Sequence, residues 1–259
     1  MLAGAGTHPR LHWDLEQDEL RFDGKRIAPR ALFIRYDVFT NIADGRAQSA
    51  ARAYAWFTAV ASWAAAHDEV RLLNRHHSAQ LLKPQQLTAA RVCGLAIPKT
   101  LVSNDLKAIR KLDAAKTIVK PVTGGDYTQT LASVLPSTEE RAGAAPSPAI
   151  VQERLVPPEL RVYRVGSKFL SFDVKSSALD YRTANDTTVT FRKNDPSLIP
   201  PLRRLMNLLR LDFGAADFKT CPRTGRSLFL EVNSSPMFAA FDAASDGAVS
   251  DAIADYLIS

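Results

Sequence analysis

Two apolar segments near the end of the chain, DFGAADFKT (212–220) and SLFLEVN (227–233), predict a β-hairpin, because the CPRTGR sequence between them is typical of a turn. A turn centred in that linking sequence places Asp217 roughly opposite Glu231 on antiparallel strands. Both carboxylates lie among apolar neighbours, where a charged group is costly unless it is paired or bound to a metal ion. The sequence therefore predicts that Asp217 and Glu231 are each paired with a cation or bound to a metal ion.

The same hairpin offers a third oxygen donor. Asn233 follows Glu231 by two positions, so both side chains point to one face of the strand. Two carboxylates and one amide oxygen suit Mg²⁺ or Mn²⁺, which keep open positions for phosphate oxygens. The alternative is an acidic, solvated hairpin face without a ligand. The apolar neighbours favour a metal site formed by Asp217, Glu231 and Asn233.

The composition is that of a soluble folded protein of one large or two small domains. The chain has 259 residues, of which 46% are apolar and 23% are charged. No apolar run approaches the roughly 18–20 residues of a membrane span, the start lacks a secretory signal, and two cysteines are too few for a disulfide framework. We therefore expect a cytoplasmic protein with no membrane partner.

The chain carries a basic surplus, with a net charge of +6. This charge suits nucleotide phosphates or an acidic substrate. No dense run of Lys and Arg with interleaved aromatic residues is present, so we expect no nucleic-acid partner.

Periodicity along the chain predicts an α+β protein with two lobes that meet near residue 150. The Asp-Gly pair at 23–24 is typical of a tight hairpin turn. The apolar residues of segment 44–67 have the spacing of an amphipathic helix. The polar, Pro- and Ala-rich composition of residues 136–148 predicts a loop. The aromatic and apolar stripe on that helix is interpreted as core; it consists of Tyr54, Phe57, Val60 and Trp63.

Two lysines stand at positions suited to phosphate binding. Pro84 fits the first turn of a helix, which puts Lys83 at the helix entry. Lys120 ends the strand TIVKP and precedes a Thr-Gly-Gly turn, where a lysine can hold polyphosphate. A surface lysine at a strand end explains Lys120 equally well. The P-loop motif, the dinucleotide-binding glycine fingerprint and the serine-hydrolase elbow are all absent from the sequence.

Six stretches in order along the chain resemble motifs of the ATP-grasp superfamily, particularly the RimK-like ligases and the maturases of graspetide (microviridin-type) peptides. The resemblance covers roughly residues 70–259. The stretches are LLKPQQLTAARVCGLAIPKT (81–100), TIVKPVTGG (117–125), AIVQERLVPPELRVYRVG (149–166), ALDYRTAN (178–185), GAADFK (214–219) and FLEVNSSP (229–236).

The resemblance implies an ATP-grasp fold, in which two α+β lobes sandwich ATP after a reduced N-terminal region. The implied domains are residues 1–80, a reduced N-terminal region for substrate or leader recognition, then lobe A at 81–149 and lobe B at 150–259 with the metal site. It also implies roles for particular residues. ATP would be bound by Lys83, Lys120, Gln152, Glu153, Arg154, Leu155, Glu159 and Arg182; Arg182 and Lys175 would act in catalysis; Asp217, Glu231 and Asn233 would hold Mg²⁺ or Mn²⁺.

The implied activity is ATP-dependent ligation of a carboxylate through an acyl phosphate, on Glu or Asp side chains of a ribosomal peptide. One alternative is a RimK-like ligase that adds an amino acid to a protein or small-molecule carboxylate. Others are a kinase of the same fold and a non-catalytic nucleotide-binding protein. The implied partners are an acidic peptide or amino acid, and assembly into a homodimer or larger homo-oligomer stays open.

Overall fold

The computed structural model describes residues 9–35, 47–75, 81–122, 128–176 and 187–259. The chain divides into two units, Met1–Arg75 with Asp255–Ser259, and His76–Ala254. Each unit is described by itself below. The lobe boundary near residue 150 stays a prediction. Among the described residues, every helix is too short or too polar to cross a membrane.

The Asp-Gly pair forms the predicted tight turn in the first unit. Asp23 and Gly24 have φ angles of 48° and 80°, and positive values at both central positions are those of a type I′ turn. The turn links β2 (Glu19–Phe22) to β3 (Lys25–Arg26), and β1 (Leu11–Asp14) pairs with β2 to complete a 3-stranded sheet.

The predicted amphipathic helix is α2 (Ala47–Ala66). Its buried side chains, Trp63 and Ala64, lie near its C-terminal end, where they pack with Leu20 of β2. Tyr54 is 62% exposed, so the interpretation of the whole stripe as core was wrong at this position. The apolar cluster of the unit gathers at the last turns of the helix and leaves Tyr54 outside it. The unit also contains a short parallel pair, β4 (Ala31–Leu32) with β5 (Arg71–Leu72).

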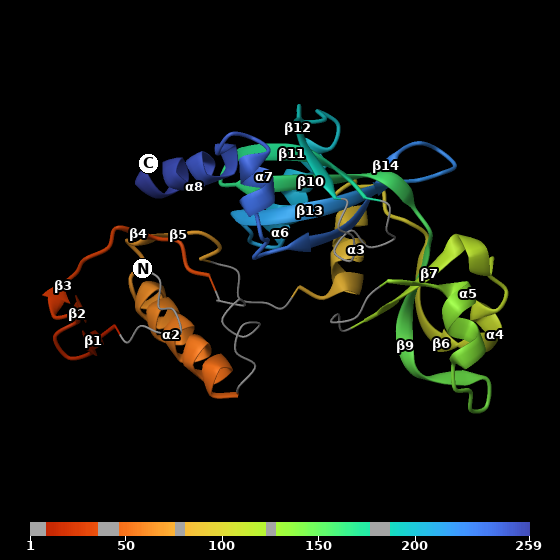
Figure 1. Ribbon diagram of the computed structural model, residues 1–259, viewed down its shortest axis with the longest axis horizontal. Helices are drawn as coiled ribbons and strands as arrows, with labels where there is room; N and C mark the ends of the chain where they lie inside the picture. The colour runs from red at the N-terminus through yellow and green to blue at the C-terminus, as the bar shows by residue number, and fades with distance from the viewer. Residues whose placement is uncertain (1–8, 36–46, 76–80, 123–127, 177–186) are drawn as a thin grey trace. The chain divides into compact units, whose positions relative to one another are not determined.

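The second unit contains a 4-stranded antiparallel sheet of order β6-β9-β7-β8 (Figure 1). Its core consists of Leu106, Ile109, Leu131 and Val151. The strands are β6 (Thr100–Asp105), β7 (Thr117–Pro121), β8 (Gln129–Thr130) and β9 (Ala144–Glu153), and the helical segments beside them are α4 (Leu106–Ile109), η1 (Ala114–Lys116), α5 (Leu131–Val134) and η2 (Leu135–Ser137).

The prediction of a polar loop over residues 136–148 was wrong at its C-terminal end, because β9 begins at Ala144. Its prolines, Pro146 and Pro148, lie beyond the pairing with β7, which ends at Ala149. They fall where the register with β6 shifts, so the missing N–H groups of proline interrupt no regular ladder.

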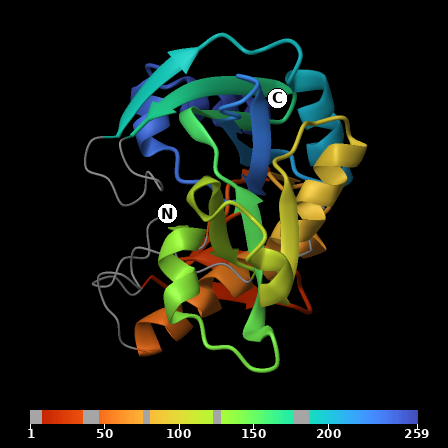
Figure 2. The ribbon, with the colours of Figure 1, turned by 90° about the vertical axis from the view of Figure 1, so that its right-hand side faces the viewer.

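The 5-stranded antiparallel sheet of order β12-β11-β10-β13-β14 separates two layers. One face packs on α3 (Lys83–Val92) and α6 (Ile199–Leu208), which lie side by side (Figure 2). The other face meets α7 (Ala239–Ala243), where the Phe241 ring contacts two rings of the sheet. The strands are β10 (Val156–Val165), β11 (Lys168–Lys175), β12 (Thr188–Arg192), β13 (Phe213–Thr220) and β14 (Ser227–Asn233), and α8 (Ala248–Ile258) follows α7.

Candidate active site

The predicted hairpin forms from β13 and β14, and it contains a β-bulge. Phe218 pairs with Phe229, but the next residue of β13, Asp217, pairs with Glu231. Leu230 is therefore an extra residue in β14. In an unbroken ladder Asp217 would face Leu230, and Glu231 would point to the other face of the sheet. The bulge thus turns Glu231 to the face that carries Asp217.

The three predicted metal-binding residues share one face of the sheet. Glu231 lies directly opposite Asp217, as predicted, and Asn233 pairs with Ala215 two positions along β13. The Asp217 side chain is 16% exposed and that of Glu231 38%. Asn233 is exposed, and its Oδ1 accepts a hydrogen bond of 2.9 Å from the backbone N–H of Ser235. These oxygen donors fit a divalent cation, and metal binding by them stays a prediction.

Arg161 is a member of this site that the sequence reasoning missed. It pairs with Asp217 from the neighbouring strand β10. Its Nε and Nη2 donate to the two oxygens of Asp217 at 2.7 and 2.8 Å, a bidentate ion pair. The guanidinium also lies over the Phe241 ring, 5.2 Å from its centroid. An arginine inside the apolar strand LRVYRV was the signal that could have found it.

Lys83 contacts the second carboxylate of the pair. It is the first residue of α3, with Pro in the first turn as predicted. Its Nζ lies 3.2 Å from Oε2 of Glu231, and the two side chains are 30% and 38% exposed. The structure therefore places one cation beside each carboxylate of the hairpin.

Lys120 lies in the 4-stranded sheet, with a neutral partner. Its Nζ donates to Oε1 of Gln152 at 3.2 Å, and Nε2 of Gln152 donates to Oγ1 of Thr100 at 2.9 Å. Gln152 is 3% exposed. The two predicted ATP-binding residues Lys120 and Gln152 are thus in contact with each other.

The segment assigned to adenine binding joins β9 to β10. The N–H groups of Glu153 and Arg154 donate to the carbonyls of Lys99 and Lys116 at 3.0 and 2.8 Å. Oε1 of Glu153 also accepts from the N–H of Lys99 at 2.9 Å, and Leu155 is buried. Adenine binding stays a prediction, in which the carbonyl groups and the N–H of Leu155 would contribute.

Glu159, assigned to ribose, forms an ion pair with Lys219 at 2.6 Å. The two side chains are 15% and 9% exposed. Glu159 and Lys219 face each other across β10 and β13, on the same face as Arg161 and Asp217.

Of the two predicted catalytic residues, Lys175 and Arg182, the structure describes only Lys175. Lys175 is the last residue of β11 and is exposed. Strand alternation puts it on the face opposite to Phe172, which pairs with Arg161, so the sheet does not bring Lys175 beside Asp217. Arg182 and the Thr-Gly-Gly turn at 123–125 lie outside the described residues.

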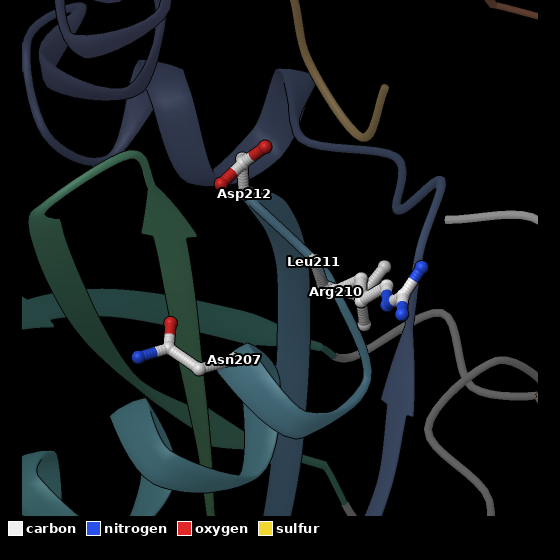
Figure 3. Close-up of a pocket in the computed structure, with 4 residues that line it drawn as sticks. All are labelled: Asn207, Arg210, Leu211 and Asp212. Atoms are coloured by element: carbon white, nitrogen blue, oxygen red, sulfur yellow. The ribbon is translucent and has the colours of Figure 1, made fainter. Parts of the chain in front are cut away.

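Two recesses of the second unit lie apart from these residues. One of about 430 Å³ is lined by residues between the end of α6 and the start of β13, which Figure 3 shows. They are Asn207, Arg210, Leu211 and Asp212. The other, of about 300 Å³, lies at Gly94–Ala96, Asp195 and Gly225–Ser227. Neither recess includes a predicted site residue.

Solved structures of similar fold include peptide-modifying enzymes. The ATP-grasp ligase PsnB complexed with precursor peptide PsnA2 and AMPPNP matches with a TM-score of 0.68 and 22% identity over 98% of this chain and 87% of that chain. The macrocyclase MdnC from Microcystis aeruginosa MRC, bound with precursor peptide MdnA, has a TM-score of 0.68 and 21% identity over 98% and 88%. A Chryseobacterium gregarium RiPP-associated ATP-grasp ligase, in complex with ADP and a leader and core peptide, has 0.68 and 19% over 98% and 86%.

No family model matches the sequence, and no curated protein does. The likeness to the solved structures is one of fold, since it extends over nearly the whole chain at low sequence identity. The α+β class predicted from the sequence is confirmed, and the second unit contains two antiparallel sheets. The chain has the ATP-grasp fold.

Proposed function

We propose that the protein is an ATP-dependent carboxylate ligase that forms ester or amide bonds on Glu or Asp side chains of a peptide. One observation carries the proposal: Asp217 and Glu231 face each other on the sheet with Arg161 and Lys83 beside them. Solved structures of the same fold hold precursor peptides and nucleotides. This supports a peptide substrate, and the net charge of +6 supports an acidic one.

The chemistry proceeds in two steps. The γ-phosphoryl group of ATP moves to an oxygen of the substrate carboxylate, which gives an acyl phosphate and ADP. An amine or hydroxyl then attacks the acyl carbon, loses its proton, and expels inorganic phosphate. The net change in the peptide is the loss of one water. Charge on the transferring group is the main barrier, so positioned cations rather than an enzyme nucleophile are required.

The residues of this chain bind and orient the charged groups. Asp217, Glu231 and Asn233 would hold Mg²⁺, which would supply charge neutralisation at the phosphate oxygens when bound. Lys83, the first residue of α3, and Lys120, in β7 of the 4-stranded sheet, would contact phosphate oxygens. Arg161 keeps Asp217 oriented through two parallel hydrogen bonds. Arg182 is proposed to stabilise the acyl phosphate.

The test is ADP release from MgATP by the purified protein with a panel of acidic peptides and amino acids, read beside mass spectrometry. ADP release with loss of one water per bond from a peptide supports the crosslinking ligase. Gain of an amino-acid residue supports the RimK-like alternative. A stable phosphorylated product supports a kinase, and nucleotide binding without turnover on any substrate supports a binding protein.

A matched pair of variants sharpens this test. Glu231→Gln removes one proposed metal ligand, and we expect turnover to fall by about 10²-fold or more, the scale of lost charge stabilisation. Glu140→Gln is the control, because Glu140 is equally exposed, at 36%, and pairs with Arg110 on the 4-stranded-sheet side. Equal turnover of the two variants contradicts the assignment of Glu231.

A further inference from the structure

The strand that carries Glu231 and Asn233 lies at the edge of its sheet. Among the described strands β14 pairs with β13 alone, so its outer N–H groups face no further described strand. Acceptors come from α3 and the residues after it instead. The N–H of Phe229 donates to the carbonyl of Ala96 at 2.8 Å, and the N–H of Val232 donates to Oε1 of Gln86 at 2.6 Å.

The spacing of these two bonds marks the bulge. In a regular strand the N–H groups that point outward are two residues apart, so after Phe229 the next would be that of Glu231. Here the N–H of Val232 points outward, because Leu230 is the extra residue. The bond to Gln86 therefore forms only in the register that turns Glu231 and Asn233 toward Asp217.

Gln86 is well suited to hold this register. Its side chain is 3% exposed, and both ends of its amide are engaged. Oε1 accepts from Val232, while Nε2 donates to the carbonyl of Leu81 at 3.3 Å. An amide fixed at both ends has one orientation, and breaking the Val232 bond would leave a buried acceptor unpaired, which destabilises the altered register.

Lys83 lies one turn before Gln86 on the same helix, and it reaches the neighbouring residue of β14. Its contact with Glu231 is partly exposed and screened by water, so it constrains the strand weakly. The buried bond of Gln86 to Val232 is the stronger constraint. We propose that Gln86 is a positioning residue, which keeps the metal-binding side chains of β14 on the face of Asp217. This inference rests on the proposed function.

The test measures metal binding rather than turnover. Gln86→Met keeps the length and apolar volume of the side chain but removes the acceptor. In the presence of ADP, we expect Mn²⁺ to bind about 10–100-fold more weakly, as is typical when a residue that orients metal ligands is lost. Binding is read from the free Mn²⁺ signal in electron paramagnetic resonance. ADP binding without metal should stay close to wild type.

The control separates positioning from general stability. Ser171→Ala removes another buried hydrogen bond of the same sheet, from Ser171 Oγ to Asn194 Oδ1 at 2.7 Å, and leaves β14 untouched. It should lower the melting temperature without weakening Mn²⁺ binding.

The outcomes distinguish this inference from the function on which it rests. If the wild-type protein binds neither ADP nor Mn²⁺ with ADP, the proposed function fails. If the wild-type protein binds them and folded Gln86→Met binds Mn²⁺ equally well, the positioning role alone is overturned. If Gln86→Met does not fold, Gln86→Asn replaces it in the test. Its shorter side chain holds the amide one methylene farther from Val232, and we again expect weaker Mn²⁺ binding in the presence of ADP.

Discussion

The two sheets of the second unit hold their lysines and arginines in different ways. On the 5-stranded sheet two buried cations face carboxylates, in the pairs Arg161 with Asp217 and Lys219 with Glu159. In the 4-stranded sheet Lys120 faces the neutral amide of Gln152. A carboxylate that is largely buried depends on a paired cation, because an unpaired buried charge is costly, whereas a neutral amide does not. Removing the partner of a buried carboxylate should therefore lower the free energy of unfolding more than removing the partner of Lys120.

The largest effect is expected for Arg161→Met, because it leaves Asp217 without its bidentate partner at a site only 16% exposed. Breaking a buried ion pair by removing one partner costs about 3–5 kcal/mol. Urea unfolding of the variant measures this loss. Arg192→Met is the control, since the Arg192–Asp173 pair is 44% and 29% exposed and should cost about 1 kcal/mol or less. Equal losses of unfolding free energy in the two variants would show that the buried pair contributes no more to stability than the exposed one.

A smaller effect is expected for Gln152→Leu in the 4-stranded sheet. The variant removes the hydrogen bonds to Lys120 and Thr100 but leaves no carboxylate unpaired. The free energy of unfolding should fall by about 1–3 kcal/mol, as for two net hydrogen bonds. Gln129→Leu, at an exposed position of β8, is the control and should stay within about 0.5 kcal/mol. A loss as large as that of Arg161→Met would contradict the contrast between the sheets.

Lys83→Met should change stability by about 1 kcal/mol or less, because its ion pair with Glu231 is partly exposed. The variant also removes a cation that competes with a metal ion for Glu231. Mn²⁺ binding without nucleotide should therefore tighten by about fivefold or less, while binding of ATP weakens. Calorimetric titration checks both results. Lys116→Met, which removes the exposed Lys116–Asp113 pair, is the control and should leave Mn²⁺ binding unchanged. Weaker Mn²⁺ binding in Lys83→Met alone would contradict the idea that Lys83 competes with a metal ion for Glu231.

The smallest effect is expected in the first unit, whose ion pair depends on pH. Nδ1 of His67 contacts the carbonyl of Trp63 at 2.7 Å, and Nε2 contacts Oδ2 of Asp18 at 3.0 Å. Both partners are acceptors, so this geometry favours the protonated imidazolium, in which both ring nitrogens donate. The Trp63 carbonyl raises the pKa of His67 above its ordinary value, and Asp18 raises it further. A hydrogen bond from the Trp13 indole, with a further one from His67, lowers the pKa of Asp18.

The directions of these two pKa shifts define the pH range in which the His67–Asp18 pair stabilises the fold. A raised histidine pKa stabilises the fold fully below the unfolded value, near 6.5, and the contribution is lost as pH rises through the folded value. A lowered aspartate pKa contributes above 3.8, and its contribution is lost as pH falls through the folded value. Melting temperatures should therefore decline as pH rises above about 6.5. His67→Gln should flatten this decline, and the exposed-residue variant His12→Gln should preserve it.

Several features of the site followed from local sequence. Proline in the first turn indicated where α3 begins, and that start brings Lys83 to the carboxylates. The position of the turn indicated that Asp217 lies roughly opposite Glu231, and alternation indicated that Glu231 and Asn233 share a face. These features depend on residues close together in the chain, which is why sequence periodicity could predict them.

Other features depend on distant contacts and were not predictable in this way. The bulge at Leu230 is tied to the bond between Val232 and Gln86, residues 146 positions apart. The role of Arg161 depends on which strand lies beside β13. Likewise the exposure of Tyr54 depends on where the apolar cluster meets α2, which periodicity does not specify.

The bulge in β14 has a consequence for how the hairpin can change in evolution. Loss of one residue elsewhere in a strand reverses the facing of every later side chain. Deletion of Leu230 would instead restore a regular ladder with Glu231 still opposite Asp217. The hairpin can therefore lose Leu230, beside the Asp217–Glu231 pair, without changing the face to which Glu231 points. Homologues that lack this residue should keep the acidic pair in phase and pair the shortened strand differently with α3.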